Sequence, residues 1–292
     1  MSGPRRPPPR PGLGTAPPRG LTARGLEPAI HAAIDAGCVL YDTAEIYGTE
    51  PLLGRALRER GVDRNSVELV TKLWQTNHAP EHVLEACRGS LRRLAVDVVD
   101  LYLVHAPESW RYCGPLEIAP DDTREAIESR AVPRDAKGTV EHGGSTLAQT
   151  WEAMLDLVRR GLARGVGLAN VGERELAALE ARGLAAPAAI EVELHPLRPQ
   201  AELRRRCAQR GTRVLAQSPL AGAALLDHAV VRKLAAELAV EPARLLLRWH
   251  LDRGVEPIPG SSRPEHVRTN LSPLDSALPE PIASALDRLL HV

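Results

Sequence analysis

The feature that most constrains the fold is a regular alternation of short apolar runs with longer amphipathic stretches, as in repeated βα units. The apolar runs are typical of buried parallel strands, and they lie at Val39–Tyr41, Val67–Thr71, Val99–Val104, Val166–Leu168, Ala189–Val192, Arg213–Ala216 and Val255–Ile258. A further short strand is expected at Leu13–Thr15. Eight strands that alternate with helices predict an α/β fold, a closed (β/α)₈ barrel of the TIM type.

The amphipathic stretches between these runs predict helices. Several end in glycine, which is typical of the left-handed residue that closes a helix. The predicted helices lie at Leu26–Ala36, Pro51–Arg60, Glu81–Leu94, Leu147–Arg160, Glu173–Ala181, Ala201–Arg210 and Val230–Leu238. No GxGxxG turn follows an early strand, which argues against an open sheet that binds a dinucleotide.

A chain of 292 residues has a normal length for one α/β barrel. Its first twenty residues are rich in Pro, Arg and Gly, and proline cannot donate a hydrogen bond within a central strand. We therefore expect residues 1–20 to be a disordered tail that contains the short first strand. Residues 21–292 are expected to form the barrel.

Charge and composition indicate a small-molecule partner. The 37 basic residues balance the 37 acidic ones, so no net field attracts nucleic acid or an anionic membrane. The four cysteines are scattered without a CxxC pair, and no apolar run is long enough to span a bilayer. We expect a cytoplasmic protein with reduced thiols, as a monomer or weak oligomer, without a nucleic-acid or membrane partner.

One segment interrupts the alternation. Residues 106–144 are rich in Pro, Gly and charge and follow the fourth predicted strand. A loop of that length in a compact domain is usually functional or disordered. On a barrel it would lie over the catalytic face, so both a substrate cover and a floppy insertion stay open.

Polar residues follow three successive predicted strands. Asp42, Lys72 and His105 come directly after the runs that end at residues 41, 71 and 104, and the carboxyl ends of barrel strands share one rim. Tyr47, in the loop after Asp42, can lean over the same mouth. These four residues are the predicted catalytic set.

Elementary chemistry gives each member of this set a role. A tyrosine with a pKa near ~10 is a poor acid at neutral pH, and an ammonium beside it lowers that pKa. Lys72 is placed to supply the ammonium, and Asp42 can keep Lys72 charged. His105 can orient a carbonyl oxygen or share the proton transfer. No metal site is expected, since Pro80 interrupts the spacing of His78 and His82.

Several motifs in the chain resemble the aldo-keto reductase superfamily. They are YDTAEIYGTEPLLGRAL, VELVTKLW, VDVVDLYLVHAP, GVGLANVGEREL, IEVELHPL, VLAQSPLAG and PIPGSSRPEHVRTNL. The resemblance implies a barrel that binds NADPH, or sometimes NADH, and transfers hydride from nicotinamide C4 to an aldehyde or ketone. It also implies that Tyr47 donates the proton, that Lys72 and Asp42 tune Tyr47, and that His105 orients the carbonyl.

The last of these motifs predicts the phosphate end of a cofactor site. Ser261, Ser262 and Arg263 lie where a helix is expected to begin, and backbone N–H groups there favour an anion such as the adenosine 2′-phosphate. The resemblance assigns Asn270 to the adenine end. Further cofactor contacts are expected at Ser218 and Leu220. Because many relatives carry basic residues where this chain has Gly260 and His266, NADH also stays open.

The nicotinamide end departs from the family pattern. In the family that the chain resembles, the nicotinamide carboxamide is commonly held by Ser and Asn at one strand end and by Gln at the next, and a Tyr stacks on the ring. The corresponding residues here are Ala169, Asn170, Glu191 and Gln217. Glu191 could accept a hydrogen bond from the carboxamide, and Gln217 could cover the ring with its amide plane.

Three functions fit these observations. The leading one is an NADPH-dependent oxidoreductase that reduces an aldehyde or ketone with Tyr47 as proton donor. A second is a biosynthetic reductase that uses the same tetrad on an imine or an activated alkene. A third is a nucleotide-binding sensor or regulatory barrel with little turnover, against which the complete tetrad argues.

Overall fold

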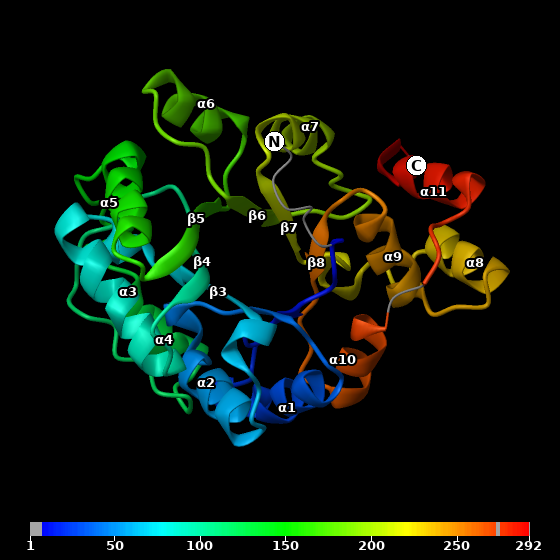
Figure 1. Ribbon diagram of the computed structural model, residues 1–292, viewed down its shortest axis with the longest axis horizontal. Helices are drawn as coiled ribbons and strands as arrows, with labels where there is room; N and C mark the ends of the chain where they lie inside the picture. Colours follow the sequence, from blue (N-terminus) through cyan, green and yellow to red (C-terminus); the bar gives the residue numbers. More distant parts are fainter. Residues whose placement is uncertain (1–7, 273–274, 292) are drawn as a thin grey trace.

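Eight parallel strands form a closed barrel in the computed structural model, which describes residues 8–272 and 275–291. The strands follow the chain order around the ring, and Figure 1 shows the helices outside them. Gly14 and Gly260 form the parallel bridge that joins the first strand to the segment after the last. The predicted (β/α)₈ barrel is therefore confirmed.

The strands lie within two residues of nearly all predicted limits. They are β1 (Leu13–Gly14), β2 (Leu40–Asp42), β3 (Glu68–Leu73), β4 (Val99–Val104), β5 (Ala163–Ala169), β6 (Ala189–Glu193), β7 (Arg213–Gln217) and β8 (Glu256–Ile258). Only β5 begins three residues earlier than predicted, because its start pairs with β4 although Arg164 interrupts the apolar run.

The helices comprise the predicted ones and several others. They are α1 (Glu27–Asp35), α2 (Glu50–Glu59), α3 (Pro80–Leu94), α4 (Arg124–Ala131), α5 (Leu147–Arg159), α6 (Glu173–Ala181), α7 (Ala201–Arg210), α8 (Ala229–Glu237), α9 (Pro242–Leu251), α10 (Pro264–Leu271) and α11 (Glu280–Asp287). No described helix is long and apolar enough to cross a membrane.

Two apolar layers hold the barrel together. The larger lies between the sheet and the surrounding helices, and the smaller fills the barrel interior with Leu40, Val70, Leu101, Leu103, Ala169, Ala189, Leu215 and Ile258. Alternate residues of β2 to β7 supply the two layers, as the period of a strand requires. Gly54 lets α2 approach the end of α3, because a Cβ there would lie 2.2 Å from the Leu94 carbonyl oxygen.

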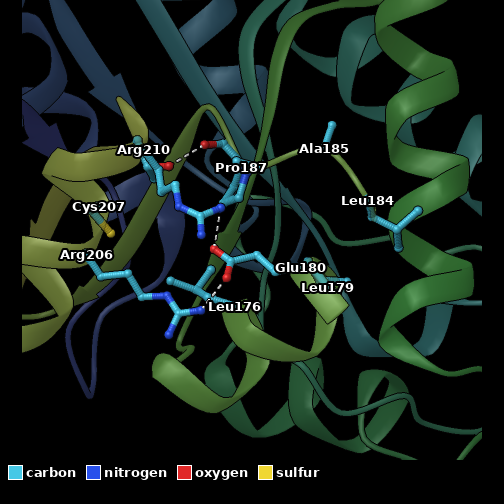
Figure 2. A pocket seen from close by; sticks show the side chains of 11 residues that line it. Leu176, Leu179, Glu180, Leu184, Ala185, Pro187, Arg206, Cys207 and Arg210 are labelled. Carbon is cyan, nitrogen blue, oxygen red and sulfur yellow. Dashed lines mark hydrogen bonds and ion pairs between the residues drawn. The ribbon is translucent and has the colours of Figure 1, made fainter. Parts of the chain in front are cut away.

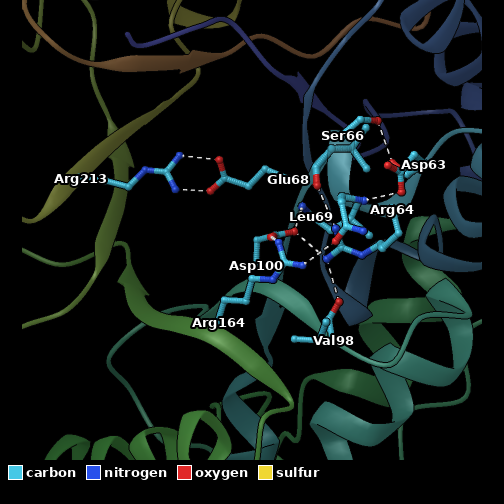
Figure 3. Close-up of polar contacts among 11 residues, drawn as sticks. Asp63, Arg64, Ser66, Glu68, Leu69, Val98, Asp100, Arg164 and Arg213 are labelled. Atoms are coloured by element: carbon cyan, nitrogen blue, oxygen red, sulfur yellow. Dashed lines mark hydrogen bonds and ion pairs between the residues drawn. The ribbon is translucent and has the colours of Figure 1, made fainter. Parts of the chain in front are cut away.

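Ion pairs connect the strands at the amino-terminal end of the barrel (Figure 3). Arg213 at the start of β7 binds Glu68 of β3, with 2.8 Å between Nη2 and Oε2, and also binds Glu256 of β8. Arg64 and Arg164 both bind Asp100, at 2.6 and 2.7 Å. These ion pairs join β7 to β3 and β8, and β4 to β5.

A second polar group lies at the periphery, between α6 and α7 (Figure 2). Glu180 binds Arg206 at 2.7 Å and Arg210 at 2.8 Å. The cavity beside them holds about 10 Å³, which is near the minimum for one water molecule. It is too small for a ligand.

The long segment 106–144 is partly ordered by contacts with β3. It contains α4 and two antiparallel bridges, Trp110 with His142 and Arg134 with Val140. Trp74, directly after β3, donates from Nε1 to the Ala131 carbonyl at 2.8 Å. The segment therefore lies against the carboxyl end of the barrel, where a substrate cover was one of the two predictions.

Candidate active site

The four predicted catalytic residues come together at the carboxyl end of the barrel. Asp42 is the last residue of β2, and Lys72 is the next-to-last of β3, so both lie inside their strands rather than after them. His105 directly follows β4, and Tyr47 ends a short 3-10 helix after β2. Parallel register brings these strand ends to one rim.

Lys72 is enclosed by oxygen atoms and its side chain is only 1% exposed. Its Nζ binds Asp42 Oδ1, donates to the Thr43 carbonyl at 3.0 Å, and lies 3.2 Å from Glu191 Oε2. Burial opposes a charge on Lys72, but Asp42 and Glu191 outweigh burial, so its pKa lies above the ordinary value. The lysine is therefore an ammonium at neutral pH.

Asp42 and Glu191 share that single ammonium. Burial, and then the nearby Glu191 carboxylate, raise the pKa of Asp42 well above its ordinary value, although Lys72 acts in the opposite direction. Among the described residues, Glu191 Oε2 has no hydrogen-bond partner. The contact between Lys72 and Glu191 was not foreseen from the sequence.

Tyr47 and His105 lie next to each other beside this ion cluster. Tyr47 Oη is 3.5 Å from His105 Nε2, and Lys72 Nζ is 5.4 Å from the centre of the Tyr47 ring. Burial raises the pKa of Tyr47 more than Lys72 lowers it. Lys72 thus acts in the predicted direction but is outweighed by burial, and Tyr47 is a neutral phenol. Burial, with Lys72 and His78 nearby, also keeps the pKa of His105 well below its ordinary value.

Trp74 contacts His105 and Trp110 contacts Trp74, and neither tryptophan was predicted to belong to the catalytic set. The Trp74 ring lies edge-on to His105 at 5.0 Å between centroids, and Trp110 lies edge-on to Trp74 at 5.4 Å. Trp74 follows Lys72 by two residues, so its place after the strand end was the available signal. The two rings make an aromatic wall on one side of His105.

A cavity of about 860 Å³ extends from the catalytic end of the barrel to α10. This volume is typical of a small-molecule or cofactor site. Of the residues predicted to form the site, the cavity is lined by Asp42, Tyr47, Glu191, Gln217, Ser218, Leu220, Ser261, Ser262, Arg263 and Asn270. Lys72 is buried beside it, and His105 contacts Tyr47.

The side chains of Asn170 and Gln217 form a hydrogen bond with each other. Gln217 Nε2 donates to Asn170 Oδ1 at 2.6 Å, and Asn170 Nδ2 donates to the His105 carbonyl at 2.7 Å. Asn170 has a positive φ of 56°, which costs strain in a residue other than glycine. Asn170 does not line the cavity itself, and it ties the ends of β4, β5 and β7 together.

The far end of the cavity is more exposed. Ser261 Oγ accepts from the Arg263 backbone N–H at 3.1 Å, directly before α10, and Pro264 occupies the first helical position. The Arg263 side chain is 64% exposed and binds Glu265 at 2.7 Å. Its guanidinium is therefore accessible, although Glu265 competes for it.

Comparisons with known proteins agree with this architecture. The model of the Aldo/keto reductase family matches residues 12–291. The chain is 34% identical to human aldo-keto reductase family 1 member A1, over 86% of this chain and 77% of that protein. It is 36% identical to glycerol 2-dehydrogenase (NADP(+)) of Saccharomyces cerevisiae, over 83% and 76%.

Solved structures have the same fold. An aldose reductase from Giardia lamblia superimposes with a TM-score of 0.85 at 27% identity, covering 97% of this chain and 92% of that one. One from Schistosoma japonicum gives 0.83 at 28% identity, covering 94% and 86%. The chain belongs to the aldo/keto reductase family and is an NAD(P)H-dependent oxidoreductase.

Proposed function

We propose that this protein reduces an aldehyde or ketone with NADPH, and that Tyr47 donates the proton. One observation carries the proposal: a single cavity has Asp42 and Tyr47 at one end and Ser261, Ser262 and Arg263 at the other. An extended dinucleotide needs an anion site at one end and a reactive site at the other. NADH remains a second candidate cofactor.

The residues of the cavity fit such a cofactor. Arg263 and the backbone before α10 would hold the 2′-phosphate, with Asn270, Ser218 and Leu220 along the wall. Glu191 Oε2, buried and without a hydrogen-bond partner among the described residues, would accept from the carboxamide of a nicotinamide. The bound reduced nicotinamide supplies hydride to the substrate carbon.

The chain's own residues would hydrogen-bond the substrate oxygen and protonate it. Tyr47 is neutral because its pKa is raised, so its phenol can give a proton to the developing alkoxide. His105 is also neutral and 3.5 Å from Tyr47 Oη, so the ring can hydrogen-bond the same oxygen. Lys72 would stabilise the phenolate that remains on Tyr47 after transfer.

Glu191 also favours a second candidate substrate, an imine. A protonated imine is a cation, and the carboxylate of Glu191 lines the cavity close to Asp42 and Lys72. An anionic wall stabilises a cationic group more than a neutral carbonyl. Reduction of a cyclic imine at a higher rate than ketones would favour this candidate.

The test is to follow nicotinamide absorbance with NADPH and then NADH against a panel of aldehydes, ketones and cyclic imines. Tyr47→Phe should lower kcat for carbonyl reduction by about 10² to 10⁴ while the Kd for NADPH stays the same. Full activity in Tyr47→Phe would contradict the proton-donor role. Tight NADPH binding without turnover of any substrate would instead indicate a nucleotide sensor.

A further inference from the structure

The ion cluster beneath Tyr47 contains two carboxyl groups and a single ammonium. Lys72 Nζ contacts both Asp42 and Glu191, and the Lys72 and Glu191 side chains are 1% and 2% exposed. Water therefore screens this cluster poorly. Because burial and Glu191 raise the pKa of Asp42 well above its ordinary value, Asp42 is the carboxyl of the pair that holds a proton, and the negative charge that faces the cavity lies on Glu191.

Apart from Lys72, no positively charged group of the described chain is paired with Glu191. His105 is neutral because burial and Lys72 lower its pKa, and Tyr47 is an uncharged phenol. The guanidinium that lines the cavity, Arg263, belongs to its other end and binds Glu265. The cavity therefore has the Glu191 carboxylate at its catalytic end and a basic residue at its far end.

The Glu191 side chain carries its negative charge at the surface of the cavity. It lies in the middle of β6, lines the cavity, and carries the buried Oε2 without a hydrogen-bond partner among the described residues. Lys72 approaches Oε2 at 3.2 Å, without forming a hydrogen bond. A cationic ligand group in the cavity would complete the electrostatic pairing of this carboxylate.

We propose that Glu191 makes this site bind the oxidised nicotinamide cofactor tightly relative to the reduced one. The oxidised ring carries a positive charge and the reduced ring carries none, so only the oxidised form gains from the Glu191 carboxylate. The inference rests on the proposed function, because it requires the nicotinamide to occupy the tetrad end of the cavity.

The consequence concerns the direction of the reaction. A site that stabilises the oxidised ring makes the bound reduced cofactor a stronger hydride donor, because the two binding equilibria and the redox equilibrium form one thermodynamic cycle. Glu191 would thus favour reduction of substrate over its oxidation. It acts through the charge on the bound cofactor and moves no proton.

The experiment measures Kd values for three probes, NADP⁺, NADPH and adenosine 2′,5′-bisphosphate, by calorimetry. Glu191→Gln should weaken NADP⁺ binding by about tenfold or more and change the Kd of NADPH by less than about threefold. The bisphosphate lacks nicotinamide, so its Kd should stay the same. Thermal unfolding of each variant checks that it is folded.

Glu193→Gln is the matched control. Glu193 lies two residues along the same strand, is 40% exposed, and binds Arg198 at 2.5 Å outside the cavity lining. This variant should leave the ratio of the two Kd values unchanged. If Glu191→Gln fails to fold, Glu191→Ala removes the same charge with a smaller side chain, and the same change in ratio is expected.

The outcomes separate the inference from the function beneath it. If Glu191→Gln, or Glu191→Ala in its place, weakens NADP⁺ and NADPH equally, or neither of them, the inference is overturned while the cofactor site stands. If wild-type protein binds neither dinucleotide, both the proposed function and the inference are wrong.

Discussion

The charged side chains at the two ends of the cavity differ in burial and in the elements that hold them. At the catalytic end, Lys72 and its two carboxylates are almost fully buried and belong to three different strands. At the far end, Arg263 and Glu265 form one ion pair beside α10, and both are more than half exposed. The strands of the sheet fix the positions of the first group. The second group is fixed only by the backbone next to α10 and is largely exposed to solvent.

Because of this difference, substitutions at the two ends should affect different properties: the reaction at the catalytic end and the cofactor preference at the far end. Breaking a buried ion cluster leaves charges that water cannot reach, which costs several kcal/mol. An exposed pair contributes at most about 1 kcal/mol and rearranges readily. The geometry around Tyr47 should therefore tolerate little change, while the choice between NADPH and NADH should be adjustable by single substitutions near α10.

The largest effect is expected from Lys72→Met. Loss of the ammonium leaves Asp42 and Glu191 side by side, so stability at pH 8 should fall by about 3–5 kcal/mol. Reduction should slow by at least about a hundredfold, because the phenolate of Tyr47 loses its neighbouring cation. Chemical denaturation and steady-state kinetics measure the two losses.

Lys233→Met is the control for this variant. Lys233 lies exposed on α8, so its removal should change stability by less than about 0.5 kcal/mol. If Lys72→Met were as stable as Lys233→Met at pH 8, the buried cluster would not have the charge distribution described. Lower pH should restore part of the lost stability, because a protonated carboxyl removes the repulsion.

The sequence predicted which residues meet at the catalytic end better than it predicted the charge interactions between them. Asp42, Lys72 and His105 could be found because each polar residue ends or follows an apolar run, and the barrel brings such ends together. The contact of Lys72 with Glu191 could not be found this way. It joins β3 to β6, strands that are not neighbours in the sheet, so it depends on how side chains meet across the barrel interior.

The long segment shows a second limit of sequence reasoning. Its Pro, Gly and charged residues predict a loop, and α4 has too few buried residues to produce a clear apolar stripe. The segment is held by hydrogen bonds to residues far from it in the sequence, such as those from Trp74 Nε1 to the Ala131 carbonyl and from the Trp110 N–H to the Gln75 carbonyl. No periodicity within the segment indicates such a contact. The assignment of residues 1–7 to a disordered tail lies outside the described residues, and the division at residue 20 stays a prediction.

A smaller but measurable effect is expected at Glu45, another buried carboxyl near Tyr47. It accepts from the Trp74 backbone N–H at 2.6 Å and from Asn77 at 2.9 Å. Burial raises the pKa of Glu45 from 4.5 to about 7, although these two hydrogen bonds lower it in part. Between those pH values the unfolded chain releases this proton while the folded protein keeps it.

Glu45 should therefore lower the free energy of unfolding by about 3 kcal/mol as the pH rises from 4.5 to 7. Glu45→Gln cannot titrate and should flatten that part of the stability curve, measured by urea denaturation across the range. Glu85→Gln, on the exposed side of α3, should keep the wild-type slope. A Glu45→Gln curve parallel to the wild-type curve would show that another group causes the slope.

The smallest effect is expected from Glu265→Gln at the exposed end. A hydrogen bond from its own backbone N–H, and then Arg263, lower the pKa of Glu265, so it is a carboxylate that competes with a phosphate for the Arg263 guanidinium. Its removal should tighten NADPH binding about threefold and leave NADH unchanged, since exposed pairs contribute little. Arg263→Ala should instead weaken NADPH about tenfold and NADH less than about twofold. An equal response of both cofactors to Glu265→Gln would mean that the 2′-phosphate does not reach Arg263, and the contrast between the two ends of the cavity would no longer explain cofactor choice.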